Sequence, residues 1–134
     1  MTTRRGGCHC GAVRFEAEGE LEGLEVCNCS ICLAKAYVHW YVPRERFRLL
    51  SDPDAITTYR FGTGKAEHRF CATCGVAPFY VPRSDPDKID VNVRCLDGMT
   101  LAELESLPAT LFDGEHWEES FQKLRGRGGD GSIS

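Results

Sequence analysis

Eight cysteines, gathered into closely spaced groups, constrain the fold of this 134-residue chain more than any other feature. They form two pairs far apart in the sequence, one central group of three, and a single residue: Cys8/Cys10, Cys71/Cys74, Cys27/Cys29/Cys32 and Cys95. A disulfide within such a short pair would close a strained ring, whereas a tight turn can direct two thiolates at one ion. The spacing therefore favours metal binding over a framework of disulfides.

The two outer pairs together supply four thiolates, the number that a tetrahedral zinc site requires. Gly7, Gly11 and Gly75 flank the two turns, as expected where the backbone curls around an ion without clashes of Cβ atoms. We predict a structural zinc site, similar to a zinc ribbon, that joins the first strand to a late hairpin. Such a site can contribute on the order of 10 kcal/mol to folding, which is comparable to the net stability of a small domain.

The central group of three cysteines predicts a second and different metal site. Three thiolates leave one coordination position for water or a substrate atom, which is typical of catalytic zinc. Two alternatives stay open. His39, His68 or Cys95 could close a second structural site, or the cluster could work without metal in redox or thiol-transfer chemistry.

The residues between the cysteines predict a mainly β fold, an open sandwich or barrel of short antiparallel strands with one short helix. The expected strands lie within residues 7–18, 37–42, 47–50, 56–61, 67–70, 78–81 and 89–93. Thr100 and Glu103 have the spacing of a capping box, and Leu101, Leu104 and Leu107 follow as an apolar stripe before a proline. We expect a single domain over residues 1–124 and a disordered, glycine-rich tail over residues 125–134.

Composition argues against several classes of partner. The net charge is −4, and the basic residues are scattered, so neither nucleic acid nor an anionic membrane is expected as a partner. The first residues have no apolar stretch of signal-peptide length, and no later segment approaches the roughly 18 apolar residues of a membrane span. These features predict a cytoplasmic protein.

Several sequence blocks resemble a known family. GCHCGAVRF, CNCSICLAKA and HRFCATCG resemble the glutathione-dependent formaldehyde-activating enzymes. The longer run ITTYRFGTGKAEHRFCATCGVAPFYVPRSDP, with NVRCLDG and FDGEHWE, resembles the centromere protein V branch of that family. The resemblance implies a zinc-stapled β fold with two Zn²⁺ sites. Its structural ligands match Cys8, Cys10, Cys71 and Cys74, and its catalytic or glutathione-responsive cluster matches Cys27, Cys29 and Cys32.

The same resemblance implies a carbon–sulfur lyase that makes S-(hydroxymethyl)glutathione from glutathione and formaldehyde. On this hypothesis, the open zinc position accepts the sulfur of glutathione or a similar thiol, which then adds to a small aldehyde. His39 and His68 are the candidate proton shuttles. A histidine in a strand like that of His39 is more often a packed or hydrogen-bonded core residue, and His68, three residues before Cys71, could support a metal ligand or lie at the surface. The alternatives are a non-enzymatic module that binds glutathione or zinc, and a module for protein interaction.

Overall fold

Alternating apolar residues and frequent glycine and proline punctuation produce short strands along the chain. A computed structural model describes residues 2–113, 116 and 118. Its strands are β1 (Thr3–Gly7), β2 (Arg14–Glu18), β3 (Leu24–Cys27), β4 (Val38–Pro43), β5 (Phe47–Leu49), β6 (Ile56–Tyr59), β7 (Glu67–Cys71), β8 (Phe79–Val81), β9 (Lys88–Asn92) and β10 (Ala109–Phe112). Its α-helices are α1 (Ser30–Lys35) and α2 (Leu101–Ser106). Short 3₁₀ turns occupy Arg44–Arg46, Pro53–Ala55 and Val93–Cys95.

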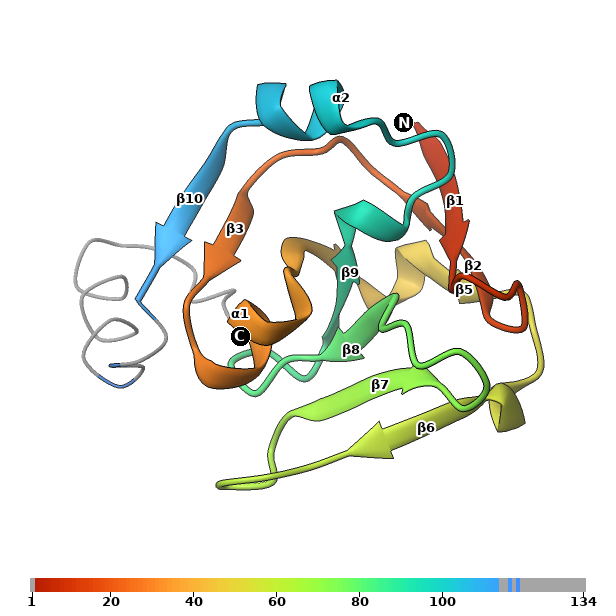
Figure 1. Ribbon diagram of the computed structural model, residues 1–134, viewed down its shortest axis with the longest axis horizontal. Helices are drawn as coiled ribbons and strands as arrows, with labels where there is room; N and C mark the ends of the chain where they lie inside the picture. Colours follow the sequence, from red (N-terminus) through yellow and green to blue (C-terminus); the bar gives the residue numbers. More distant parts are fainter. Residues whose placement is uncertain (1, 114–115, 117, 119–134) are drawn as a thin grey trace.

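The strands form two sheets (Figure 1). The small sheet has the order β1-β2-β5, and the large sheet has the order β10-β3-β4-β9-β8-β7-β6. Neighbouring strands are antiparallel except for β10, which lies parallel to β3 with Leu111 opposite Val26. The large sheet thus carries the first cysteine of the central group, Cys27, at the end of β3, and the second outer pair at the end of β7 and just after it.

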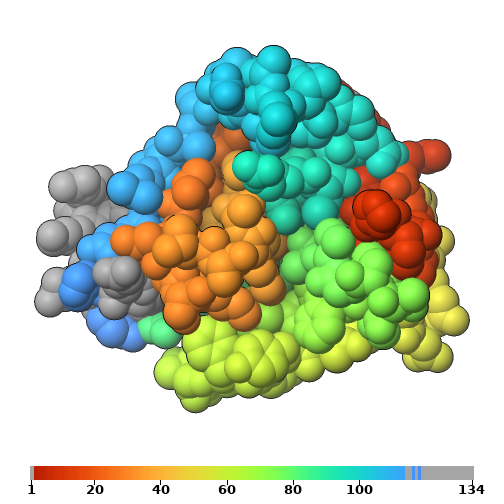
Figure 2. All heavy atoms as spheres, in the orientation of Figure 1, coloured from red at the N-terminus to blue at the C-terminus, as the bar shows by residue number. Residues whose placement is uncertain are grey.

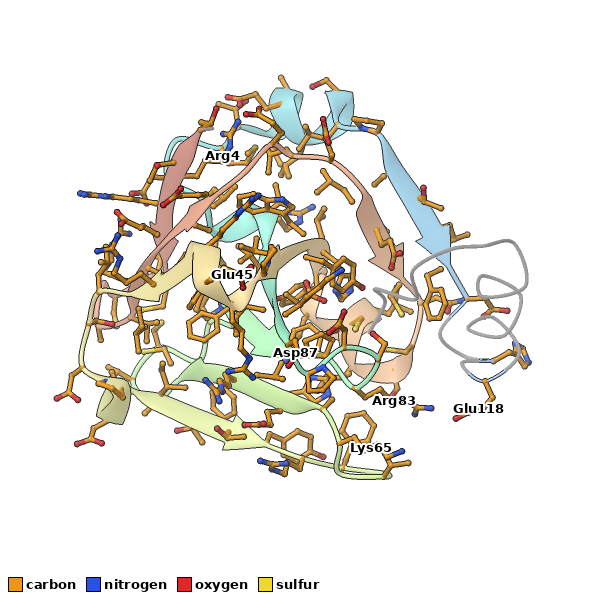
Figure 3. All side chains as sticks on the ribbon, turned by 180° about the vertical axis from the view of Figure 1, so that it is seen from behind. Arg4, Glu45, Lys65, Arg83, Asp87 and Glu118 are labelled. Carbon is orange, nitrogen blue, oxygen red and sulfur yellow. The ribbon has the colours of Figure 1, made fainter. Side chains whose placement is uncertain are left out.

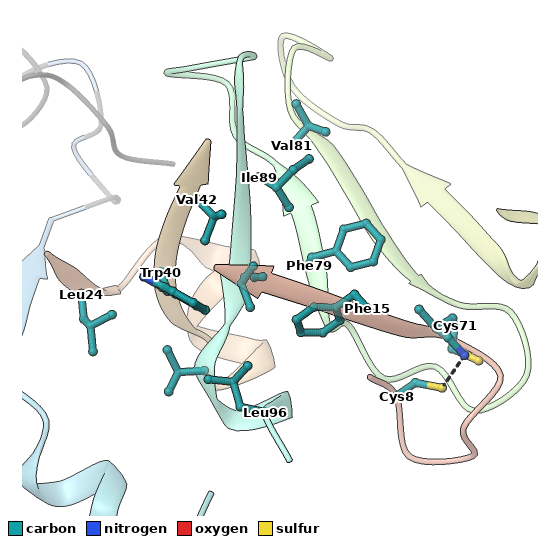
Figure 4. Close-up of a cluster of buried hydrophobic side chains, with 14 residues drawn as sticks. Cys8, Phe15, Leu24, Trp40, Val42, Cys71, Phe79, Val81, Ile89 and Leu96 are labelled. Atoms are coloured by element: carbon teal, nitrogen blue, oxygen red, sulfur yellow. Dashed lines mark hydrogen bonds between the residues drawn. The ribbon is translucent and has the colours of Figure 1, made fainter. Parts of the chain in front are cut away.

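The main core lies between the small sheet and one face of the large sheet (Figure 4). Phe15 of β2 packs its ring 5.5 Å from that of Phe47 and 6.0 Å from that of Phe79. Trp40 and Val91, paired across β4 and β9, are almost fully buried in the same cluster. Because side chains alternate along a strand, the neighbours of these apolar residues must point to the opposite face.

That opposite face of the large sheet is polar and aromatic. A row of facing residues crosses five strands: Tyr41, Asp90, Tyr80, His68 and Tyr59. Most of the row is buried, and α1 lies on this side of the sheet (Figure 1). Both faces of β4 are therefore largely covered, as its alternating aromatic and aliphatic sequence predicts.

The mainly β fold is confirmed, with two corrections to its details. The chain forms a second helix, α1, which Cys29 begins by accepting a hydrogen bond from the backbone N–H of Cys32. Ala36 ends the helix in the left-handed conformation, with φ 55°. The strands are also not all antiparallel, because α2 returns the chain to the edge of the sheet in the direction of β3.

The predicted C-terminal helix forms as α2. The Thr100 hydroxyl accepts a hydrogen bond from the Glu103 backbone N–H at 3.1 Å. Leu104 and Leu107 pack against the core, but Leu101 is 71% exposed, so the apolar stripe is shorter than the sequence predicts. No helix in the described part of the chain is long and apolar enough to cross a membrane. The predicted domain end at residue 124 and the tail over residues 125–134 lie outside the described residues.

Candidate metal centres

The two outer cysteine pairs meet in space, although about 60 residues separate them in the sequence. Cys8 and Cys10 lie in the turn from β1 to β2, while Cys71 ends β7 and Cys74 lies in the turn that follows it. The Sγ atom of Cys10 lies 3.7 Å from that of Cys8 and 3.7 Å from that of Cys71, and all four sulfurs fall within 4.8 Å of one another. A tetrahedral zinc with bonds of about 2.3 Å requires sulfur separations of about 3.8 Å.

Backbone N–H groups also prepare this four-cysteine cluster for a metal. The N–H of Val13 donates to the Sγ of Cys8 at 3.3 Å, and those of Thr73 and Cys74 donate to the Sγ of Cys71 at 3.3 and 3.4 Å. The backbone N–H of Val76 is the main cause that lowers the pKa of Cys74 to about 6. These donors favour thiolates, which are the form that binds metal.

The glycines around the four-cysteine cluster serve two different needs. Gly11 and Gly75 adopt positive φ angles of 86° and 81°, as the sequence predicts for turns that curl around an ion. Gly7 instead allows a close approach, since a Cβ atom there would lie 2.1 Å from the carbonyl oxygen of Val13. The turn that presents Cys8 and Cys10 therefore requires glycine on both of its sides.

The central group of three cysteines, hereafter the trio, forms a second cluster at the start of α1. Cys27 ends β3, Cys29 caps α1, Cys32 lies within the helix, and the three sulfurs fall within 4.8 Å of one another. Hydrogen bonds from the thiols of Cys27 and Cys32 lower the pKa of Cys29 to about 2. Hydrogen bonds within the trio conversely raise the pKa of the other two thiols. These hydrogen bonds favour the thiolate form at Cys29 over that at its two neighbours.

No fourth ligand joins the trio within the described part of the chain. The three residues that the sequence offered as candidates are all placed elsewhere. His39 is hydrogen-bonded to Asp90, His68 is stacked between aromatic rings, and the Cys95 thiol lies 3.8 Å from the carbonyl oxygen of Ala77. The geometry favours a site with three protein ligands over the closed alternative.

His39 and Asp90 form a buried pair on the polar face of the large sheet. The Nδ1 atom of His39 lies 2.6 Å from Oδ2 of Asp90, and both side chains are 0% exposed. Burial lowers the pKa of His39, but the charge and hydrogen bond of Asp90 outweigh this effect and raise it. The Nε2 atom of His39 has no hydrogen-bond partner among the described residues, so one nitrogen is free for a proton. His39 is therefore both a packed core residue and a candidate for proton transfer.

His68 is also buried, at 6% exposure, and is not a surface residue. Its ring stacks 5.4 Å from that of Phe61 and 4.9 Å from that of Tyr80. Burial, followed by the nearby charge of Lys35, lowers the pKa of His68 to about 4, so the ring is neutral at pH 7. Environments that drive the pKa values of two histidines in opposite directions are typical of acid and base pairs in active sites.

Sequence reasoning missed Asp90 and Lys35 as candidate functional residues. Polar and apolar residues alternate along β9, which predicts that the side chain of Asp90 points to solvent. In the structure, the face of the sheet that carries Asp90 is covered. No local signal in the sequence marks this burial, which follows from the pairing of β9 with β4, where Asp90 faces Tyr41. Lys35 gives no signal in the sequence, because only the fold brings it to the polar face.

The fold and the two cysteine clusters define the class of protein, and comparison with known proteins then gives the family. Two clusters made entirely of cysteine on a mainly β fold define a candidate zinc protein with one complete and one incomplete site. The family model of the glutathione-dependent formaldehyde-activating enzyme matches residues 3–112, and the chain belongs to that family. A crystal structure of a Rhodobacter sphaeroides protein is 34% identical, with a TM-score of 0.72, and the match covers 79% of this chain and 99% of that one. The centromere protein V branch stays a prediction from the motifs.

The depressed pKa of His68 predicts a specific dependence of stability on pH. A histidine that is neutral in the fold stabilises it fully above its unfolded pKa of about 6.5, and this contribution is lost as the pH falls toward 4. The loss is about 1.4 kcal/mol per pH unit in that window. His68→Phe keeps the ring stack but has no group that titrates. Between pH 7.0 and 5.5, we expect its free energy of unfolding to fall by about 1 kcal/mol less than that of the wild type. Urea unfolding measures this difference, and equal losses in the two proteins would contradict it.

Proposed function

We propose that this protein is a zinc-dependent enzyme that makes or breaks the carbon–sulfur bond between a thiol and a small aldehyde. The thiol is glutathione or a close relative, the aldehyde is formaldehyde or one of similar size, and the product is of the S-(hydroxymethyl)glutathione type. The observation that carries the proposal is the trio, whose three sulfurs converge without a fourth ligand among the described residues. Membership of the family supports the same substrates.

The donor sets fit zinc in both clusters. The four-cysteine cluster would hold a structural ion, and Cys27, Cys29 and Cys32 would hold an exchangeable one. When bound to the trio, zinc supplies an open position that lowers the pKa of a thiol and keeps it as thiolate at neutral pH. Three thiolates on a dication give a net charge of −1, which favours ligand exchange over strong activation of water.

The protein's own residues would manage the protons of this reaction. Addition of the thiol to the aldehyde forms one sulfur–carbon bond, and the thiol proton must reach the carbonyl oxygen. His39 and His68 both lie within electrostatic range of Cys29. Neutral His68 would accept the proton, and His39, stabilised in its charged form by Asp90, would donate one. Reversal of these two steps serves the cleavage direction.

Carbon-13 NMR exchange spectroscopy of labelled formaldehyde with glutathione tests the proposal. We expect zinc-loaded protein to accelerate exchange between free formaldehyde and its glutathione adduct above the uncatalysed rate, and removal of the trio metal to abolish the gain. Cys95→Ser is a matched control because this cysteine lies outside both clusters. If protein fully loaded with zinc does not raise the exchange rate above the uncatalysed rate, the proposal that it is an enzyme is refuted.

A binding module is the second candidate function. It would use the same trio to bind glutathione or zinc, and it predicts saturable thiol binding in the absence of any acceleration. A protein-interaction module predicts neither effect, and a trio variant would then keep full function in cells. Calorimetric titration with glutathione beside the NMR assay distinguishes the three outcomes.

A further inference from the structure

A cavity of about 410 Å³ opens between α1 and the segment that joins β7 to β8. Its lining residues come from α1, β7, the turn after Cys74 and β9: Lys35, Phe70, Gly75, Val76, Ala77 and Asn92. Figure 2 shows the atoms of α1, in orange, facing those of the β7–β8 segment, in green. Sites for small molecules have volumes in this range, so the cavity is large enough for a short peptide.

Lys35 gives this cavity its charge. It ends α1 three residues after Cys32, and burial lowers the pKa of its amino group while the charges of Cys32, Cys29 and Asp90 oppose that effect. Its ammonium makes no hydrogen bond or ion pair with any residue that the structure describes. Arg69, on the β7 strand that borders the cavity, is in contrast paired with Glu67 at 3.0 Å. A half-buried cation is costly unless an anion accompanies it.

No other described residue that lines the cavity carries a positive charge that could compete for an anion. The Asn92 amide is partly engaged, since its Nδ2 donates to the carbonyl oxygen of Ala77 at 3.2 Å and its Oδ1 accepts from the backbone N–H of Arg94 at 3.1 Å. Phe70 and Val76 are apolar. The cavity therefore fits a ligand with an apolar or amide body and one negative group directed at Lys35.

We propose that Lys35 binds a carboxylate of the thiol substrate and so selects thiols that carry one. This inference rests on the proposed function, because it places the sulfur of the same molecule at the trio. Lys35 lies on the helix that carries Cys32 and within electrostatic range of Cys29, so one small peptide can reach both. The lysine thus determines substrate specificity and takes no part in the chemical step.

Three thiols test the assignment by calorimetric titration of the zinc-loaded full chain. They are glutathione, γ-glutamyl-cysteinyl-glycinamide, which lacks the glycine carboxylate, and 4-aminobutyryl-cysteinylglycine, which lacks the glutamyl α-carboxylate. We expect the wild type to bind one analogue about tenfold more weakly than glutathione, as for the loss of one charged hydrogen bond. That analogue identifies the carboxylate that Lys35 binds.

Variants of Lys35 complete the test. Lys35→Met should weaken the binding of glutathione about tenfold and leave the affinity for the weaker-binding analogue unchanged, so that the variant no longer prefers glutathione. Lys35→Arg should keep part of that preference. Lys65→Met is the matched control, because it removes one positive charge at the exposed β6–β7 turn (Figure 3). Zinc content is measured in every variant by plasma emission spectrometry.

Several results would overturn the inference. Equal binding of all three thiols by the wild type, or an equal loss for all three in Lys35→Met, would show that no carboxylate meets Lys35. Loss of zinc from Lys35→Met would show that the lysine offsets the charge of the trio instead. If zinc-loaded wild type binds none of the thiols, the proposed function fails together with the inference, whereas thiol binding that ignores Lys35 defeats the inference alone.

Discussion

Cys74→Ser is expected to yield protein that is insoluble or unfolded at room temperature. Cys74 is one of four sulfurs that join the β1–β2 turn to the β7–β8 turn, and serine is a poor zinc ligand. Closure of such a site contributes on the order of 10 kcal/mol, while the net stability of a small domain is about 5–15 kcal/mol. The loss therefore removes most or all of the stability. Circular dichroism and thermal unfolding of the purified variant measure the effect.

Cys95→Ser provides the control for this experiment. Cys95 is half-buried and its thiol lies near the carbonyl oxygen of Ala77, a contact that a serine hydroxyl can replace. We expect this variant to fold and to bind as much metal as the wild type. A soluble Cys74→Ser protein with a native spectrum and an unchanged melting temperature would show that the four-cysteine cluster is not a structural metal site.

The second large effect concerns the trio and separates activity from folding. Cys29→Ser should keep the native spectrum, because the trio packs with Phe112 in a small cluster apart from the main core. The metal content should fall from two ions to one per chain. Catalysis of adduct formation should fall by more than about a hundredfold, since even changes behind the ligands cost about 10–100-fold at metal sites.

Plasma emission spectrometry and the formaldehyde exchange assay measure this outcome on the same sample. Cys95→Ser again serves as the control, with two ions and full activity expected. Retention of the exchange rate by a Cys29→Ser protein that holds a single ion would exclude the trio as the reaction centre. Unfolding of this variant would instead assign a structural role to both clusters.

The positions of the cysteines were the most predictable part of this molecule. Four thiolates at two glycine-flanked turns can satisfy a tetrahedral ion in few ways, so spacing alone paired Cys8 and Cys10 with Cys71 and Cys74, and the structure brings them together. The alternation of Tyr37–Val42 likewise predicted a strand with two covered faces. Both predictions depend on local rules that hold whatever the topology.

The parts that could not be predicted depend on contacts between distant segments. β1 reads Thr-Arg-Arg-Gly-Gly and has no apolar pattern, yet it pairs with β2 because Gly6 and Gly7 allow close packing against Cys95 and Val13. β10 joins the sheet beside β3 only after α2 has turned the chain. Asp90 is buried because a histidine from another strand meets it. Each of these features is decided by a partner that the local sequence does not reveal.

The turn after Cys74 belongs to two sites at once. Gly75 and Val76 line the cavity, while the backbone N–H of Val76 stabilises the thiolate that precedes it. Engineering of thiol preference should therefore randomise Lys35 and Phe70 and leave residues 75 and 76 unaltered. Libraries that vary this turn would select for proteins that survive expression, and a change in selectivity could not be told apart from a change in yield.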